Sequence, residues 1–148
     1  MVPVETLRSL SCMAGMPADS LKAVAAITEE REFKTGEVLW READPVRQMC
    51  IVRQGEIDVV YHLQGGKQCV VDTVIGGEIT GWSALVEPYR HSATCIARAG
   101  GRILCIDGAA IREFCEKDSV LGYRLLTQVA RTLSSRLSGA RLQLAATS

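Results

Sequence analysis

The chain has 148 residues, with 17 lysines and arginines against 17 aspartates and glutamates, and 47% of its residues are apolar. These values fit one globular domain, exclude a disordered chain, and give no electrostatic footprint of a nucleic-acid or membrane-surface binder. No run approaches the roughly 18 apolar residues that a spanning helix needs, and the N-terminus carries no signal peptide pattern. We therefore expect a soluble, cytoplasmic protein with no membrane partner.

The first segment, residues 1–31, favours helices. Pro17-Ala18-Asp19-Ser20 is a helix-starting sequence. It is followed by apolar residues at helical spacing, namely Leu21, Val24, Ala25 and Ile27. We expect an amphipathic helix of two or three turns here, packed against the rest of the domain.

The middle segment, residues 32–107, has the punctuation of short strands. Turn signals recur about every eight to twelve residues, at Gly36, Asp44-Pro45, Gln54-Gly55, Gly65-Gly66, Gly76-Gly77, Pro88 and Gly100-Gly101. Between them we predict strands at Val38–Trp40, Met49–Val52, Ile57–Tyr61, Gln68–Val74, Ser92–Ala97 and Arg102–Ile106. The sequence has no asparagine, so glycine must supply the left-handed turn positions.

The last segment, residues 108–146, is predicted to be helical again. A short helix follows Asp107-Gly108, and Asp118 or Ser119 is expected to cap a longer one. This longer helix carries an apolar stripe at three- and four-residue spacing, formed by Leu126, Val129, Leu133, Leu137, Ala140 and Leu144. The stripe has two interpretations: packing over the β segment, or a two-helix seam that makes the protein a homodimer. We expect the homodimer.

Three glycine-containing segments carry a resemblance to a known family. They are Phe33-x-x-Gly36-Glu37-x-Leu39 with Asp44, then Ile51-Val52-x-x-Gly55-Glu56-Ile57-x-Val59, then Gly76-Gly77-Glu78-Ile79-Thr80-Gly81-Trp82-Ser83-Ala84-Leu85 followed by His91-Ser92-Ala93-Thr94. In order and spacing the chain resembles the cyclic nucleotide-binding domain of the catabolite activator protein, protein kinase A regulatory subunits and cyclic-nucleotide-gated channels. The resemblance implies an α+β, mainly β fold: a double-stranded β-helix, or jelly-roll-like, barrel flanked by N-terminal helices and a long C-terminal helix. It also implies one domain over residues 1–148.

In that family the segment matching residues 76–94 is the phosphate-binding cassette. Its glycine lets backbone approach the ligand, a short helix start offers N–H groups to the phosphate, a glutamate accepts from the ribose hydroxyl, and an arginine contacts the phosphate. The resemblance places the candidate ligand-binding residues at Gly81, Trp82, Ser83, Ala84, His91, Ser92 and Ala93.

Both charged positions of the cassette are altered in this chain. Trp82 stands where the family has the glutamate, and His91 stands where it has the arginine. Losing two charge-assisted hydrogen bonds costs about 3 to 6 kcal/mol, or two to four orders of magnitude in affinity. We therefore expect a cyclic nucleotide, cyclic AMP or cyclic GMP, to bind weakly, or another small anion to take its place.

Each altered position leaves alternatives open. Trp82 either stacks on a purine or fills the pocket that a ribose would occupy, and we favour filling. His91 is either a donor that becomes cationic towards acid pH or a histidine satisfied within its loop. Arg90 replaces the missing arginine only if the preceding loop is shorter by one residue, because adjacent side chains on a strand face opposite ways.

Other chemistry finds little support in the sequence. Gly65-Gly66-Lys67 lacks the residues of a phosphate-binding loop and is interpreted as a hairpin turn. Two histidines do not make a metal site, and no nucleophile or carboxylate pattern indicates an enzyme. The scattered cysteines, most of them inside apolar runs, are interpreted as buried reduced thiols, with a redox or metal role as the alternative; they are Cys12, Cys50, Cys69, Cys95, Cys105 and Cys115.

The sequence thus predicts a non-enzymatic regulatory sensor that signals through its C-terminal helices and requires no cofactor. Only Ala-Ala-Thr-Ser follows Leu144, so we expect no direct DNA binding; a second copy of the chain is the expected partner, and an unidentified effector protein is a further candidate. The alternative prediction is a ligand-free dimerisation or docking module in which Trp82 plugs a degenerate pocket.

Overall fold

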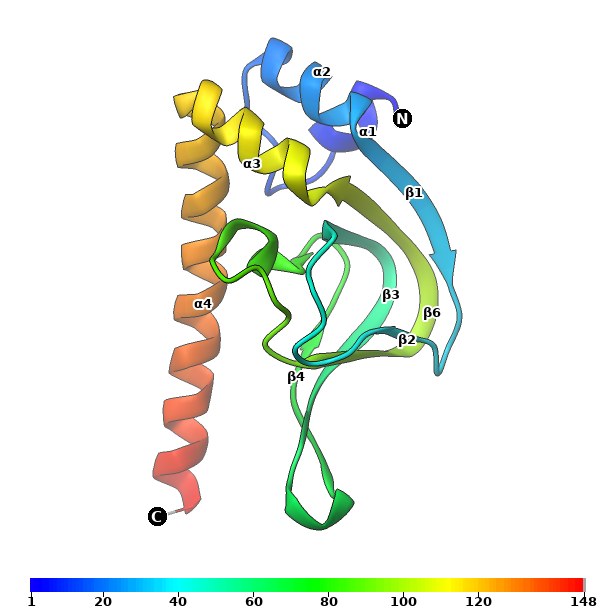
Figure 1. Cartoon of the computed structure of the whole chain (residues 1–148), viewed down its shortest axis with the longest axis vertical. Helices are drawn as coiled ribbons and strands as arrows, with labels where there is room; N and C mark the ends of the chain where they lie inside the picture. Colours follow the sequence, from blue (N-terminus) through cyan, green and yellow to red (C-terminus); the bar gives the residue numbers. More distant parts are fainter. Residues whose placement is uncertain (148) are drawn as a thin grey trace.

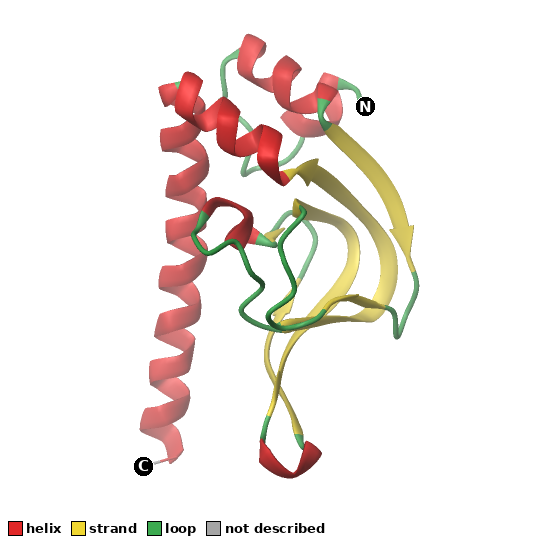
Figure 2. Ribbon diagram, viewed as in Figure 1, coloured by secondary structure: helices red, strands yellow, loops and turns green. Residues whose placement is uncertain are grey.

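A computed structural model describes residues 1–147, in which helices lie at one end and along one side of a curved sheet (Figures 1 and 2). The elements in chain order are α1 (Val4–Arg8), α2 (Ala18–Ala26), β1 (Thr28–Phe33), β2 (Val38–Trp40), β3 (Gln48–His62), the 3-10 turn η1 (Gln64–Gly66), β4 (Gln68–Val74), β5 (Ile79–Thr80), the 3-10 turn η2 (Trp82–Leu85), β6 (Thr94–Asp107), α3 (Gly108–Lys117) and α4 (Ser119–Thr147). Helices α1, α2 and α3 gather at one end of the sheet, and α4 runs along its side (Figure 1).

The sheet is antiparallel, with strand order β1-β6-β3-β4, β2 paired to β6 and β5 paired to β3. The long strands β3 and β6 bend so that the sheet curls on itself, which gives the jelly-roll type of fold predicted from the sequence (Figure 2). Among the described strands β1 and β4 do not pair, so the sheet is not closed into a barrel. The fold class, mainly β with helices before and after, is confirmed.

Two of the predicted turns are bulges inside strands. The segments Met49–Val52 and Ile57–Tyr61 are parts of one strand, β3, because Gly55 continues the chain at a positive φ of 96°. A Cβ at Gly55 would lie 2.6 Å from the Ala99 carbonyl oxygen, so the two strands approach closely here. The segments predicted at Ser92–Ala97 and Arg102–Ile106 likewise join as β6, which starts at Thr94.

β1 begins at Thr28, inside the range that the sequence predicted to be helical, so the expected boundary at residue 31 is placed too late. Its first and last residues are buried, and two of its glutamates, Glu30 and Glu32, pair with arginines of β3 and β6. Arg102 contacts Glu30 at 3.0 Å and Glu32 at 2.8 Å, and Arg53 also pairs with Glu30. Cross-strand ion pairs therefore make a strand from a charged sequence with weak strand preference.

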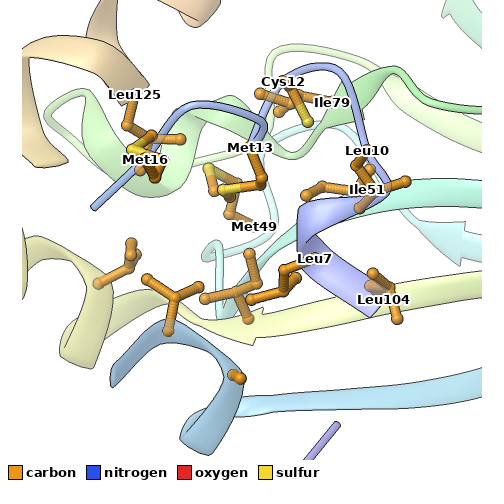
Figure 3. Close-up of a cluster of buried hydrophobic side chains, with 14 of the residues drawn as sticks. Leu7, Leu10, Cys12, Met13, Met16, Met49, Ile51, Ile79, Leu104 and Leu125 are labelled. Carbon is orange, nitrogen blue, oxygen red and sulfur yellow. The ribbon is translucent and has the colours of Figure 1, made fainter. Parts of the chain in front are cut away.

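The core lies on both faces of the curled sheet. Inside the curl, Phe33, Val52, Ile57 and Ile103 form one buried cluster. The other cluster joins the sheet to the helices, and there the segment between α1 and α2 places Leu10 and Met13 near Ile51 and Met49 of β3 (Figure 3). This second cluster holds the helices against the end of the sheet, next to β5 and η2.

Both C-terminal helices begin at aspartate caps, and of these the sequence predicted the cap at Asp118. Asp107 accepts from the Ala110 amide at 2.9 Å, and Asp118 accepts from the Leu121 amide at 3.1 Å. The hydroxyl of Ser20 in α2 also donates to Asp118 at 2.5 Å, which lowers the pKa of that carboxyl and ties α4 to α2.

The apolar stripe of α4 divides between two faces. Val129 is 3% exposed and packs inward with Leu121 and Leu125, whereas Leu133 and Leu137 are 37% and 52% exposed. The two faces lie roughly 100° apart around the helix. The intramolecular packing weighed from the sequence therefore accounts for the first half of the helix only.

The cysteines are free thiols in the described structure, and Cys12, Cys50, Cys95 and Cys105 are buried. The expectation of burial is wrong for Cys69, which is exposed because β4 is an edge strand. Within residues 1–147 no helix has the length and apolar character to span a membrane.

Candidate functional site

The cassette is built on the end of β5. Thr80 pairs with Cys50 of β3, and the chain then turns through Gly81, whose φ of 68° places it in the left-handed region. A Cβ at Gly81 would lie 2.9 Å from the Gln48 carbonyl oxygen, so glycine is required by both conformation and space. The turn η2 follows at once and starts with Trp82.

Six of the seven predicted ligand-binding residues line one cavity under this turn. They are Gly81, Trp82, Ser83, His91, Ser92 and Ala93. The seventh, Ala84, is fully buried in the cluster that joins the sheet to the helices and does not line the cavity. The cavity, which we call the cassette cavity, has a volume of about 20 Å³, space for about one water molecule.

A larger groove adjoins the cassette cavity. It lies between α4 and the β3–β4 hairpin, has a volume of about 650 Å³, and is lined by apolar residues that include Tyr61, Val71 and Leu133. Trp82 and Ser92 line both spaces. The half-buried indole of Trp82 therefore stands where the narrow cavity opens into the groove.

His91 is held as a neutral ring. It is 7% exposed and stacks on Trp40, with ring centroids 4.4 Å apart and planes 9° from parallel. Burial lowers the pKa of His91 from 6.5 to about 4, and the Asp44 carboxylate opposes this shift only in part. His91 therefore carries no charge at neutral or mildly acidic pH, and the loop satisfies its backbone through Asp44 and Ala43.

Arg90 does not replace the family's arginine. Its guanidinium donates to the Ala43 carbonyl at 2.9 Å and does not line the cassette cavity. The shortened loop that would bring Arg90 inward is therefore not seen.

The arginine that does line the cassette cavity comes from α4. Arg136 borders both the cavity and the groove, and its Nε lies 2.6 Å from Asp72 Oδ2 of β4. We did not predict this residue from the sequence. The signal was its position seven residues after Val129, which puts a charged side chain on the face of α4 that packs inward.

The cassette also contacts α3 directly. Arg112 donates to the Ala84 carbonyl at 2.8 Å and lies over the Tyr89 ring, 4.1 Å from its centroid. One side chain of α3 thus holds both the end of η2 and the loop after it. Arg112 therefore connects η2 to the first C-terminal helix.

The remaining motifs have structural roles. Gly65 and Gly66 form the hairpin turn between β3 and β4, as predicted. Glu78 accepts from the Ile75 amide at 2.8 Å and closes the turn before β5. Over residues 1–147 no three histidine, cysteine or acidic side chains gather as a metal site would require.

Comparison with known proteins places this geometry in a family. The model of the cyclic nucleotide-binding domain matches residues 30–118. The chain belongs to the cyclic nucleotide-binding domain family. Domains of this family are typically regulatory rather than enzymatic, and this one is a regulatory, sensor kind of module.

Solved structures agree with this family. A cyclic nucleotide-binding protein from Geobacter metallireducens is 31% identical, with a TM-score of 0.83 over 93% of this chain and 99% of that one. The catabolite activator protein of Thermus thermophilus is 17% identical, with a TM-score of 0.72 over 91% of this chain and 62% of that one. The Toxoplasma gondii protein kinase A regulatory domain, solved with cyclic AMP, is 21% identical, with a TM-score of 0.66 over 74% and 42%. A comparison of this chain with curated protein sequences found no match.

Proposed function

We propose that this domain is a sensor for a small anionic ligand, either a cyclic nucleotide bound weakly or another small anion, and that it signals through α3 and α4. The observation that carries the proposal is Arg136, which reaches from α4 to the cassette cavity that six predicted site residues line. Its guanidinium supplies a positive charge beside the η2 turn, where the family's own arginine position holds a neutral His91.

The groove gives such a ligand a place for its larger, apolar part. Its volume of about 650 Å³ falls within the usual range for small-molecule sites, whereas the cassette cavity of about 20 Å³ does not. A ligand with its anionic group at Ser92 and Arg136 would extend into the groove and contact the Trp82 ring. Trp82 then acts as a stacking platform, and its ring must move for the anionic group to enter.

Binding at this place would change the contacts of both C-terminal helices. An anion at Arg136 competes with Asp72, the partner that ties α4 to β4. A displacement of η2 pulls on Arg112 through the Ala84 carbonyl. Ligand binding thereby favours a different position of α3 and α4, which is a population shift driven by differential contacts.

We expect the changed position of α4 to alter contacts made by the exposed stripe of this helix. Leu126, Ala130, Leu133, Leu137, Ala140 and Leu144 repeat at alternating spacings of four and three residues, and all are exposed. This spacing is that of a two-helix seam, and we propose a homodimer about this stripe. Sedimentation equilibrium tests it: Leu126→Glu, on the part of the stripe that does not line the groove, should give monomer, while Ser135→Glu on the opposite face of the helix should leave the dimer intact.

Thermal shift and calorimetry with cyclic AMP and cyclic GMP at millimolar concentration test the ligand. A ligand at 100 times its Kd adds about 2.7 kcal/mol, so a true site is visible in the melting temperature. Arg136→Gln should abolish the stabilisation, whereas Asp72→Asn, which also breaks the ion pair but keeps the guanidinium, should retain or increase it. Stabilisation that persists equally in Arg136→Gln would contradict the proposed site.

A second candidate is favoured by the small volume of the cassette cavity. Trp82 packs against the cluster that joins the sheet to the helices, so the domain also fits a ligand-free dimerisation or docking module with a degenerate pocket. Absence of any stabilisation by both nucleotides and by phosphate, together with a dimer sensitive to Leu126→Glu, would select this second function over the first.

A further inference from the structure

Two buried cysteines face each other in the middle of the sheet, outside the cassette cavity. Cys50 of β3 and Cys105 of β6 are directly opposite residues in the strand register. The Cys50 thiol donates to the Cys105 sulfur, with the two sulfurs 3.8 Å apart. Neither belongs to the site described above, because neither lines the cassette cavity or the groove.

A separate cavity reaches both sulfurs. Its volume is about 410 Å³, and it is lined by Cys50 and Cys105 together with Arg31, Arg47, Asp44 and His91. The stacked rings of Trp40 and His91 line this cavity and the cassette cavity, so they stand between the two. A small uncharged molecule in this cavity can therefore contact the sulfurs without entering the cassette cavity.

The charged groups around the pair favour a thiolate on Cys105. The hydrogen bond from Cys50 lowers the pKa of Cys105 to about 7, and the Arg31 guanidinium acts in the same direction against the effect of burial. The same hydrogen bond and burial raise the pKa of Cys50, so Cys50 stays protonated. Arg31 is itself held by Glu37 at 2.9 Å, and His91 in the cavity wall is neutral. The two thiols thus have unequal roles.

The other buried thiols lack this environment. Burial raises the pKa values of Cys12 and Cys95 to about 11, and neither lines the cavity that holds Arg31. Thiolate is the reactive form of cysteine towards oxidants, so selectivity among buried cysteines follows thiolate character and access.

From this arrangement we propose that Cys50 and Cys105 form a dithiol site that a hydroperoxide oxidises to an intramolecular disulfide. The Cys105 thiolate attacks the peroxide oxygen, the O–O bond breaks, and the leaving hydroxide takes up a proton to become water; Cys105 is then a sulfenic acid. The Cys50 sulfur attacks the Cys105 sulfur, the S–O bond breaks, and the hydroxide takes the Cys50 proton and leaves as water. Two thiols and one hydrogen peroxide thus give one disulfide and two waters.

Backbone movement is not needed for this bond. Opposite residues in an antiparallel pair have Cα atoms about 4.5 to 5.5 Å apart, and disulfides form across about 4.4 to 6.8 Å. The sulfurs need to approach by side-chain rotation only. Because Cys50 is also the partner of Thr80, the cross-link lies next to β5, which leads into η2.

Peptide mapping after hydrogen peroxide treatment tests the proposal on the whole chain. Trypsin cuts after Arg47, Arg53, Arg102 and Arg112, so oxidation should join peptides 48–53 and 103–112 and remove two hydrogens from their summed mass. The linked pair should form in Cys69→Ser, a matched control lacking the exposed thiol, and should be absent in Cys50→Ser. Peroxide that oxidises Cys69 alone, or carries Cys105 to a sulfinic acid without linking the peptides, overturns the proposal.

The role of Arg31 is tested by the rate of linking. Arg31→Met should slow formation of the linked peptides at pH 7 by about fivefold, and Arg31→Lys should restore most of the rate. Arg53→Met is the control for losing an arginine from an ion pair with a glutamate. Arg53 lies on β3, pairs with Glu30 and does not line the cavity, whereas Arg31 pairs with Glu37 and does line it. An Arg31→Met variant that folds and links at the rate of the native chain overturns the assignment of Arg31.

Discussion

The buried ring of His91 leads to a specific pH dependence of stability. Its pKa is lowered by burial to about 4 in the folded chain, while an unfolded histidine has a pKa of 6.5. Between these two values the unfolded chain binds more protons than the folded one. Stability contributed by the neutral ring is therefore complete above about pH 6.5 and is lost as the pH falls towards 4.

The size of the effect follows from the two pKa values. Linkage over this interval gives a loss of about 2 kcal/mol in the free energy of unfolding between pH 7 and pH 5. The carboxyls of Glu30, Glu37 and Asp118, whose pKa values are lowered by their hydrogen-bond partners, lose their stabilisation only below this window. Cys105, whose pKa is lowered to about 7, also loses a stabilising contribution as the pH falls below 7, so only the part of the change that His91→Phe removes is assigned to the histidine.

Urea unfolding at pH 7, 6 and 5, followed by tryptophan fluorescence at one protein concentration, measures this loss. The variant His91→Phe keeps a ring against Trp40 and removes the titrating nitrogen, so its loss between pH 7 and pH 5 should be smaller by about 2 kcal/mol. His62→Gln changes the only other histidine and serves as the control. An unchanged pH dependence in His91→Phe, or an NMR titration of His91 near pH 6.5, would refute the reasoning.

Three further predictions concern α4 and are measured by chemical or thermal unfolding. Gly122→Ala should destabilise by about 1 to 3 kcal/mol because its Cβ would lie 2.7 Å from the Cys115 carbonyl oxygen, whereas Gly139→Ala, with nothing within 4 Å of its Cβ, should stabilise by about 0.5 to 1 kcal/mol. Val129→Ala should cost about 2 kcal/mol, since the side chain is buried between α4 and the domain. Asp118→Ala removes the cap of α4 and the contact with α2 and should lower the unfolding midpoint; an unchanged midpoint in Asp118→Ala, or a loss below about 0.3 kcal/mol in Gly122→Ala or Val129→Ala, would contradict the roles given to these residues.

Most helices and strands could be predicted because patterns of neighbouring residues determine them. The helices after Asp107 and Asp118 follow from a cap and an apolar period, both of which lie within a few neighbouring residues. β1 could not be predicted, because its glutamates are stabilised by Arg53 and Arg102, which are more than 20 residues away in sequence. Pairing partners outside the local window decide such a strand.

The glycine pairs show the same limit. Gly55 lies within β3, and the glycines at 100 and 101 lie opposite it in β6. Sequence alone gives each the signature of a turn, because a bulge and a turn both require small residues with unusual backbone conformations. Only their mutual approach across the sheet makes them bulges, and that approach is a property of the fold.

The candidate site divides along the same line. Its candidate residues all come from one segment of the sequence, and six of the seven line the cassette cavity. Arg136 lies about 45 residues further on, and its partner Asp72 belongs to a different strand. A helix that crosses the cavity can supply a side chain that no local motif records.

The position of Arg136 has a consequence for how such a module would work. An arginine within the cassette can bind a ligand without disturbing α4. Because Arg136 belongs to α4, any movement of the helix also changes the positive charge beside the cassette cavity. Arg136 and Asp72 are 25% and 38% exposed, so breaking their pair costs on the order of 1 kcal/mol or less, and a weakly held anion is sufficient to compete with the carboxylate. The family's glutamate and arginine are replaced by Trp82 and His91. The proposed site can therefore bind an anion with modest affinity and still move the helix. High salt should weaken ligand binding and change the position of α4 together, since chloride or phosphate at high concentration competes for the Arg136 guanidinium.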